Sequence, residues 1–126
     1  MSFTNATETL VLSWLFTTGT ATRPTEWHLG LFTAAPGEAG GGTELSGDGY
    51  ARKAIAFTAS GNLATNSGNV EFDAATGSWG TVTHVAVFDA ATSGNMLAYA
   101  ELDASKVIGT GDIFRVPTGD FDLTLD

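Results

Sequence analysis

The sequence predicts a mainly β fold, an antiparallel β-sandwich of about seven short strands with one N-terminal α-helix. Short runs after residue 24 alternate apolar and polar side chains, and glycine-rich turn signals separate these runs. The strand–helix–strand rhythm of a parallel sheet is missing from the pattern. A chain of 126 residues is long enough for one two-layer core. We therefore expect a single domain over 1–126, with the helix in 1–18 and the sandwich in 25–126.

The first segment has the apolar spacing of a helix. Its apolar positions, three, four and seven residues apart, are Phe3, Ala6, Leu10, Val11, Trp14 and Leu15. Thr4 or Asn5 is expected to cap the helix, and the run 17–20 to end it. Two interpretations stay open: the stripe covers the chain's own core, which we favour, or it docks onto a partner.

The remaining elements are expected to be strands joined by turns. We expect strands at 27–31, 51–57, 70–72, 82–88, 96–102, 113–116 and 121–125, and a short element near Leu63. The run 82–88 has the strongest pattern and places Val85 and Val87 on one face. Residues 35–42 form a long glycine-rich loop.

Composition and charge narrow the classes of partner. The net charge is −9 with only five lysines and arginines, which argues against nucleic acid and against anionic membrane surfaces. The chain has no apolar run near the roughly 20 residues of a membrane helix. It contains no cysteine, so disulfides and cysteine metal sites are excluded. We expect other protein chains as partners, and neither nucleic acid nor membrane.

Candidate chemistry is sparse. His28 and His84 belong to no nucleophile motif, and no serine lies in a G-x-S-x-G elbow. The triple glycine 40–42 is followed by threonine and glutamate, whose acid would repel a phosphate. Asp120 and Asp122 share one face of the last strand, where a solvated face is favoured over a bound cation. We expect no enzyme activity, cofactor or metal.

Several residues are candidates for contacts with a partner. They lie in the loop 36–50 and at aromatic and basic positions beyond it, and they are Pro36, Gly41, Glu44, Tyr50, Arg52, Trp79 and Arg115. The two arginines are either salt-bridged near an interface or ordinary cations at strand edges. Trp79 is expected to be a core anchor, with an exposed contact for sugar or protein as the alternative. Trp14 and Trp27 are expected in the core.

Blocks that carry a family likeness follow one another along the chain. They are LFTAAPG (31–37), GGTE (41–44), GYAR (49–52), ATGSWGTVTH (75–84), FDAAT (88–92), GN (94–95), GD (111–112), FR (114–115) and LTLD (123–126). Together these blocks resemble a family of small virion proteins of tailed bacteriophages, usually labelled tail fibre or minor tail proteins. The resemblance covers nearly the whole chain after the N-terminal helix.

The resemblance implies a structural component of the phage particle, assembled in the bacterial host cytoplasm beside tail or capsid subunits. It implies no catalytic residue. Tail fibres are commonly long and repetitive, and this chain is neither, so it would be a small module on a tail tip or baseplate, or else a capsid decoration (cement) protein that stabilises the phage head. A module that binds host carbohydrate stays open as a separate alternative. We predict a homo-oligomer, with a trimer expected from the symmetry axes of phage particles.

Overall fold

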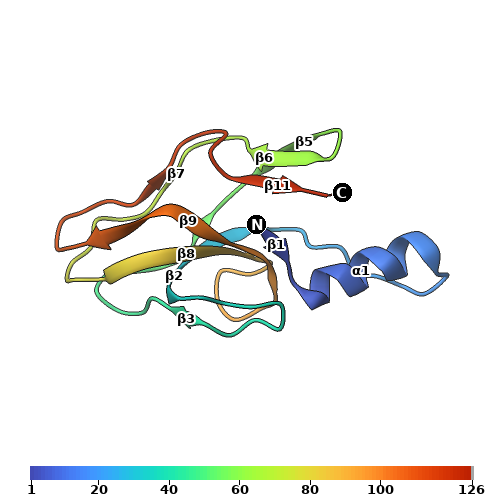
Figure 1. Ribbon diagram of the computed structural model, residues 1–126, viewed down its shortest axis with the longest axis horizontal. Helices are drawn as coiled ribbons and strands as arrows, with labels where there is room; N and C mark the ends of the chain where they lie inside the picture. The colour runs from blue at the N-terminus through green and yellow to red at the C-terminus, as the bar shows by residue number, and fades with distance from the viewer. Residues whose placement is uncertain (126) are drawn as a thin grey trace.

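The computed structural model describes residues 1–125 and is mainly β with one N-terminal helix (Figure 1). Its elements are β1 (Ser2–Phe3), α1 (Asn5–Phe16), β2 (His28–Ala34), β3 (Thr43–Glu44), β4 (Lys53–Ala54), β5 (Phe57–Ser60), β6 (Leu63–Asn66), β7 (Val70–Glu71), β8 (Gly80–Phe88), β9 (Met96–Ile108), β10 (Arg115–Val116) and β11 (Asp122–Thr124). The predicted fold class is confirmed, with more strands than expected.

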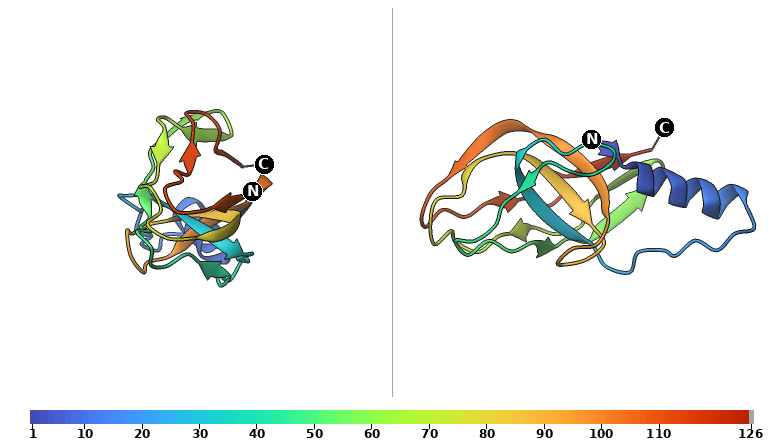
Figure 2. Two further views of the ribbon diagram at one scale, coloured as in Figure 1. Left: turned by 90° about the vertical axis from the view of Figure 1, so that its left-hand side faces the viewer. Right: turned by 90° about the horizontal axis from the view of Figure 1, so that it is seen from below.

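The strands form two layers of an open sandwich (Figure 2). The large sheet has the order β1-β9-β8-β2-β3, and β4 pairs with β2 beside β3. The opposite layer is split into a pair, β10-β7, and a three-stranded sheet, β11-β6-β5. All of these pairings are antiparallel, as a chain of short strands and tight turns requires.

The core fills the space between the two layers. Leu29 and Leu31 point inward from β2, and Val85 and Val87 point inward from β8, as their alternation predicts. The opposite layer contributes large side chains to the same core, and these include Phe72, Phe114, Val116 and Phe121. The rings of Phe72 and Phe114 meet edge to face with centroids 5.8 Å apart.

Two strand predictions are corrected by the structure. The expected strand 51–57 is two strands in different sheets, because the chain leaves the large sheet after β4 and joins the three-stranded sheet at β5. The expected strand 96–102 continues to Ile108 as β9. A bulge hides this continuation: Lys106 pairs with Val82 but Glu101 pairs with His84, so several residues of β9 stand opposite one of β8 and the alternation is interrupted.

The helix forms where predicted, and Thr4 caps it: its hydroxyl accepts a bond from the Thr7 amide at 3.4 Å. The expectation that α1 covers the core is wrong. It buries no residue, and Trp14 is 69% exposed. Figure 1 shows α1 projecting from one end of the sandwich. Spacing shows which side chains are apolar, but not whether a surface lies opposite them. Trp27 is half-buried and packs against the core.

Within residues 1–125, no helix has the length and apolar character needed to cross a membrane.

Candidate functional site: the outer face and the arm

The outer face of the large sheet carries a second apolar cluster. Phe32, Ala86 and Phe88 are buried there, and the rings of Phe32 and Phe88 stack with centroids 6.1 Å apart. A groove of about 570 Å³, which we call the outer groove, crosses this face. Its walls are the glycine-rich loop, the first residues of α1 and the turn before β9. Part of the loop 36–50 thus lines the outer groove, and its contact with a partner stays a prediction.

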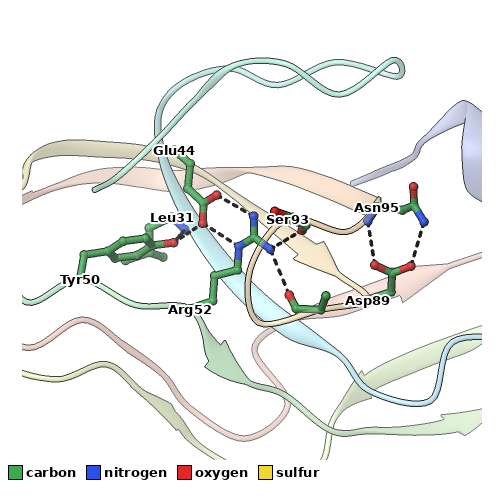
Figure 3. A network of polar contacts seen from close by, with 8 residues as sticks. Leu31, Glu44, Tyr50, Arg52, Asp89, Ser93 and Asn95 are labelled. Atoms are coloured by element: carbon green, nitrogen blue, oxygen red, sulfur yellow. Dashed lines mark hydrogen bonds and ion pairs between the residues drawn. The ribbon is translucent and has the colours of Figure 1, made fainter. Parts of the chain in front are cut away.

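Beside the groove, Glu44, Tyr50 and Arg52 form a polar network that we call the lock (Figure 3). Arg52 donates from Nε and from Nη2 to the two carboxylate oxygens of Glu44, each at 2.8 Å. The Tyr50 hydroxyl donates to Glu44 at 2.6 Å and accepts from the Leu31 amide at 3.0 Å. Such a forked arginine–carboxylate pair fixes geometry as well as charge.

Arg52 also holds the turn that leads into β9. Its Nη1 donates to the carbonyls of Ala90 and Ser93 at 3.0 and 2.8 Å (Figure 3). Its guanidinium lies 3.5 Å above the centre of the Phe88 ring. The guanidinium thus bonds four oxygens of its own chain, and its side chain is only 9% exposed. Arg52 and Glu44 are salt-bridged within the chain, and their role in partner contacts stays a prediction.

Burial and the adjacent Glu44 carboxylate change the pKa of Tyr50. Burial of the phenol, followed by its hydrogen bond to Glu44, raises the pKa of Tyr50 well above its ordinary value, because both favour the neutral hydroxyl. Gly30 leaves the space that this arrangement needs. A Cβ at Gly30 would lie 2.9 Å from a Glu44 oxygen and 3.0 Å from the Phe88 ring.

The turn held by the lock is also braced internally. The Asp89 carboxylate accepts from the Asn95 amide at 2.7 Å and from its side-chain nitrogen at 3.0 Å (Figure 3). Gly94 has a φ of +75°, and a Cβ there would come within 2.5 Å of Asp89. The lock and this brace make one side of the outer groove a fixed surface.

The predicted loop residues divide into buried and exposed. Pro36 is buried, and Gly41 is exposed with a φ of +80°. The loop is tied to the helix, since the Asn5 amide donates to the Glu38 carbonyl at 2.9 Å. Gly41 is therefore displayed on the wall of the outer groove, whereas Pro36 supports the loop from within.

Trp79 and Arg115 lie away from this face. Trp79 is 6% exposed and donates from its indole to the Asp48 carbonyl at 2.9 Å, so the prediction of a core anchor is confirmed and the exposed alternative is wrong. Arg115 pairs with Glu71 across β10 and β7 at 2.7 Å. Both partners are about half exposed, and such surface pairs contribute little to stability.

The ionisable residues are dispersed. His28 lies near Glu26 at 3.4 Å, and His84 contacts the hydroxyl of its neighbour Thr83. In the pairing of β2 with β8, His28 of β2 stands opposite Phe88, and His84 of β8 stands opposite Phe32. Across residues 1–125, histidines and acids form no group of three positioned to hold a metal ion.

The second candidate surface is one that the sequence analysis placed in the core. We call α1 and the returning residues 17–27 the arm. Leu12, Leu15 and Phe16 are 58, 55 and 76% exposed, and their spacing puts them on one face of α1. Trp14 is on the opposite side with Leu10 and Val11, facing the returning chain across a cavity. The sequence contains a signal of this exposure, because apolar side chains occur on all sides of the helix and are more than one core-facing stripe requires.

Comparison with known proteins identifies the family. The family model described as podophage GP4 fiber I protein gp80 matches residues 2–124, which include the arm, the lock and both layers of the sandwich. The search of curated proteins found no match. Because the match extends over nearly the whole chain, it bears out the resemblance to phage tail fibre proteins. The chain belongs to the family of the podophage GP4 fiber I protein gp80.

Proposed function

We propose that this chain is a structural subunit of the tail fibre apparatus of a tailed phage and that it works through contacts with other virion proteins. The single observation that carries the proposal is the family match over residues 2–124. The structure supports it in two ways. The lock gives the outer face a fixed shape, and the arm presents apolar side chains that only another surface could cover.

In this role the subunit forms a homo-oligomer, as most symmetric assemblies do. Assembly takes place in the host cytoplasm before the particle is complete. The subunit performs no catalysis. Activity of the purified protein on peptidoglycan or host polysaccharide would overturn that part of the proposal.

The decisive experiment is the copy number in the particle. Purified virions are analysed by mass spectrometry, and this polypeptide is quantified against the major capsid protein. A ratio of a few per cent or less is expected for a fibre at the tail. A ratio near one, or a sizeable fraction of one, would replace the proposal with a capsid decoration protein. Absence from purified particles would overturn the structural role itself.

Host carbohydrate binding is the remaining alternative, and it needs an exposed aromatic platform from Trp79 or Tyr50, of which Trp79 is buried and Tyr50 is half-buried with its hydroxyl bonded to Glu44. The test is adsorption: soluble protein is added to host cells, and binding is compared with that of a Gly41→Asp variant on the outer groove. We expect no saturable cell binding by the isolated subunit. Saturable binding that the variant loses, with the fold unchanged by circular dichroism, would establish a receptor role.

A further inference from the structure

A second groove lies at the base of the arm, between the first turns of α1, the returning chain and the three-stranded sheet. It has a volume of about 410 Å³, and we call it the end groove. Its lining is mostly apolar and includes Leu10, Trp27, Phe57, Ala59, Leu97 and Leu123. Four of these side chains also pack against the main core (Trp27, Phe57, Leu97 and Leu123). The core of the sandwich is thus open at the end from which the arm projects.

The arm cannot fill this groove in its own chain. Leu10 and Thr7, from the first half of α1, already form part of the wall. Phe16 follows Leu10 by six residues, which places it about 9 Å farther along the helix axis. The chain therefore carries an exposed apolar face and an apolar groove that it cannot bring together by itself.

Charge favours a second copy of this chain as the partner. The molecule carries a net charge of −9, so two copies repel each other over most of their surfaces. Residues 9–22 contain no charged side chain. Residues 9–22, which include the face of Leu12, Leu15 and Phe16, are thus a part of the surface where identical copies can meet with little repulsion, and an acidic or a basic partner would find no complementary charge on them.

The exposed apolar area of this protein is concentrated on the arm. Among residues 1–125, four of the eight large apolar side chains that are exposed belong to α1. At about 200 Å² for an aromatic side chain, Phe16 with its 76% exposure presents about 150 Å² on the face that it shares with Leu12 and Leu15. Stable interfaces bury about 800 Å² on each partner. The face of Leu12, Leu15 and Phe16 alone falls short of that value, which favours a contact that buries the arm face and the end groove of both copies over one that covers the arm alone.

We propose that the arm is the self-association element of this protein: the face formed by Leu12, Leu15 and Phe16 of one copy packs into the end groove of a second copy. A helix of 12 residues is about 18 Å long. When two arms lie side by side and antiparallel, the tip of each reaches the base of the other, so this contact joins two copies about a twofold axis in place of the trimer expected from the symmetry of phage particles. The proposal deepens the proposed function and rests on it, since a fibre subunit must join other chains.

The first test measures mass in solution. The full chain is examined by light scattering and sedimentation over a range of concentrations, and we expect an oligomer. Leu12→Glu and Phe16→Glu place a charge on the arm face, and each should weaken association by about 30-fold or more, as loss of a central contact does. Val107→Glu is the matched control, because Val107 is 74% exposed on β9 but outside the arm. It should leave the mass unchanged.

A monomer at every concentration would overturn the proposal, and so would an oligomer that the arm variants do not disturb. Circular dichroism and thermal unfolding of each variant separate loss of association from loss of the fold. If the monomer instead binds lipid vesicles or a second phage protein through the arm, the occupant of this surface is that partner and self-association is wrong.

A second test locates the contact by disulfide cross-linking. Because the chain contains no cysteine, each disulfide can form only between the introduced cysteines. A Phe16→Cys chain is mixed with a tagged Ala59→Cys chain and oxidised, so any mixed disulfide joins two copies. We expect a mixed Phe16→Cys and Ala59→Cys product, and little product when Val107→Cys replaces Ala59→Cys. Cross-linking of Phe16→Cys chains only to one another would overturn the arm-in-groove contact. Presence in virions is measured separately, so a monomeric protein found in tails would refute this inference together with the homo-oligomer, and would leave the proposed role as a tail fibre subunit standing.

Discussion

The lock and the arm are opposite solutions to the same problem of placing side chains at a surface. In the lock, the Arg52 guanidinium and the Glu44 carboxylate find all their partners within the chain, and both side chains are largely covered. In the arm, Trp14 and Phe16 are more than two-thirds exposed. The lock is complete in the single chain, whereas the arm leaves apolar area in water that a partner could cover.

The difference indicates which surface is adapted for stability and which for assembly. A paired and hydrogen-bonded charge gains nothing from a new partner and loses much when one member is removed. An exposed apolar helix contributes little to its own chain but gains when another surface covers it. Substitutions in the lock should therefore affect folding, and substitutions in the arm should affect association.

The largest effect is expected from Arg52→Met. It leaves the partly covered Glu44 carboxylate without its cation and releases the Ala90 and Ser93 carbonyls. We expect the free energy of unfolding to fall by about 3 kcal/mol, as for other buried pairs that lose one member. Urea unfolding at neutral pH measures it.

Arg115→Met is the matched control, because Arg115 also pairs with a glutamate but is 57% exposed. Its effect should stay within about 0.5 kcal/mol. Equal losses in the two variants would show that the lock is no more important than a surface pair.

The next effect concerns the space beside the lock. Gly30→Ala would push a methyl group against Glu44 and the Phe88 ring, and a crowded site of this kind loses about 1–3 kcal/mol. Gly68→Ala is the control, since nothing lies within 4 Å of a Cβ there. An unchanged free energy of unfolding in the Gly30→Ala variant would mean that Glu44 moves aside easily and that the lock is not rigid.

A smaller effect is expected from alkaline pH. The pKa of Tyr50 is raised in the folded chain, so the unfolded chain loses that proton first and stability falls as the pH rises above the ordinary value of 10. By pH 11 the loss should be on the order of 1 kcal/mol, since Tyr50 is only partly buried. Urea unfolding between pH 8 and 11 tests this, and Tyr50→Phe should flatten the decline. An unchanged slope in that variant would assign the decline to other groups.

The strands could be predicted wherever alternation was uninterrupted. Val85 and Val87 indicate the strand β8, because every second residue of a strand faces the same layer. The bulge between Glu101 and Lys106 breaks that rule, so the far half of β9 was missed. The chain's change of sheet between β4 and β5 was missed too, because a continuous apolar pattern does not show which neighbour each strand pairs with.

The sequence predicts which residues belong to the candidate site better than it predicts how these residues are arranged. The sequence names Glu44, Tyr50 and Arg52, but their mutual bonds depend on a loop that leaves the edge of β2 after β3 and returns to the same edge at β4, and no spacing rule gives this path. The arm was assigned to the core because an apolar helix usually covers one. Whether a surface lies opposite Trp14 is a property of the whole fold and not of the helix.

The smallest effect on folding is expected in the arm. Leu12→Ala removes apolar area that is already 58% exposed, so unfolding measured at low protein concentration should change by no more than about 0.5 kcal/mol. At high concentration the parent chain should become more stable than the variant, because association stabilises the folded chain by mass action. Thermal unfolding over a hundredfold range of concentration distinguishes the two regimes. A large loss at low concentration would mean that the arm face is covered within the single chain, contrary to its exposure in this fold.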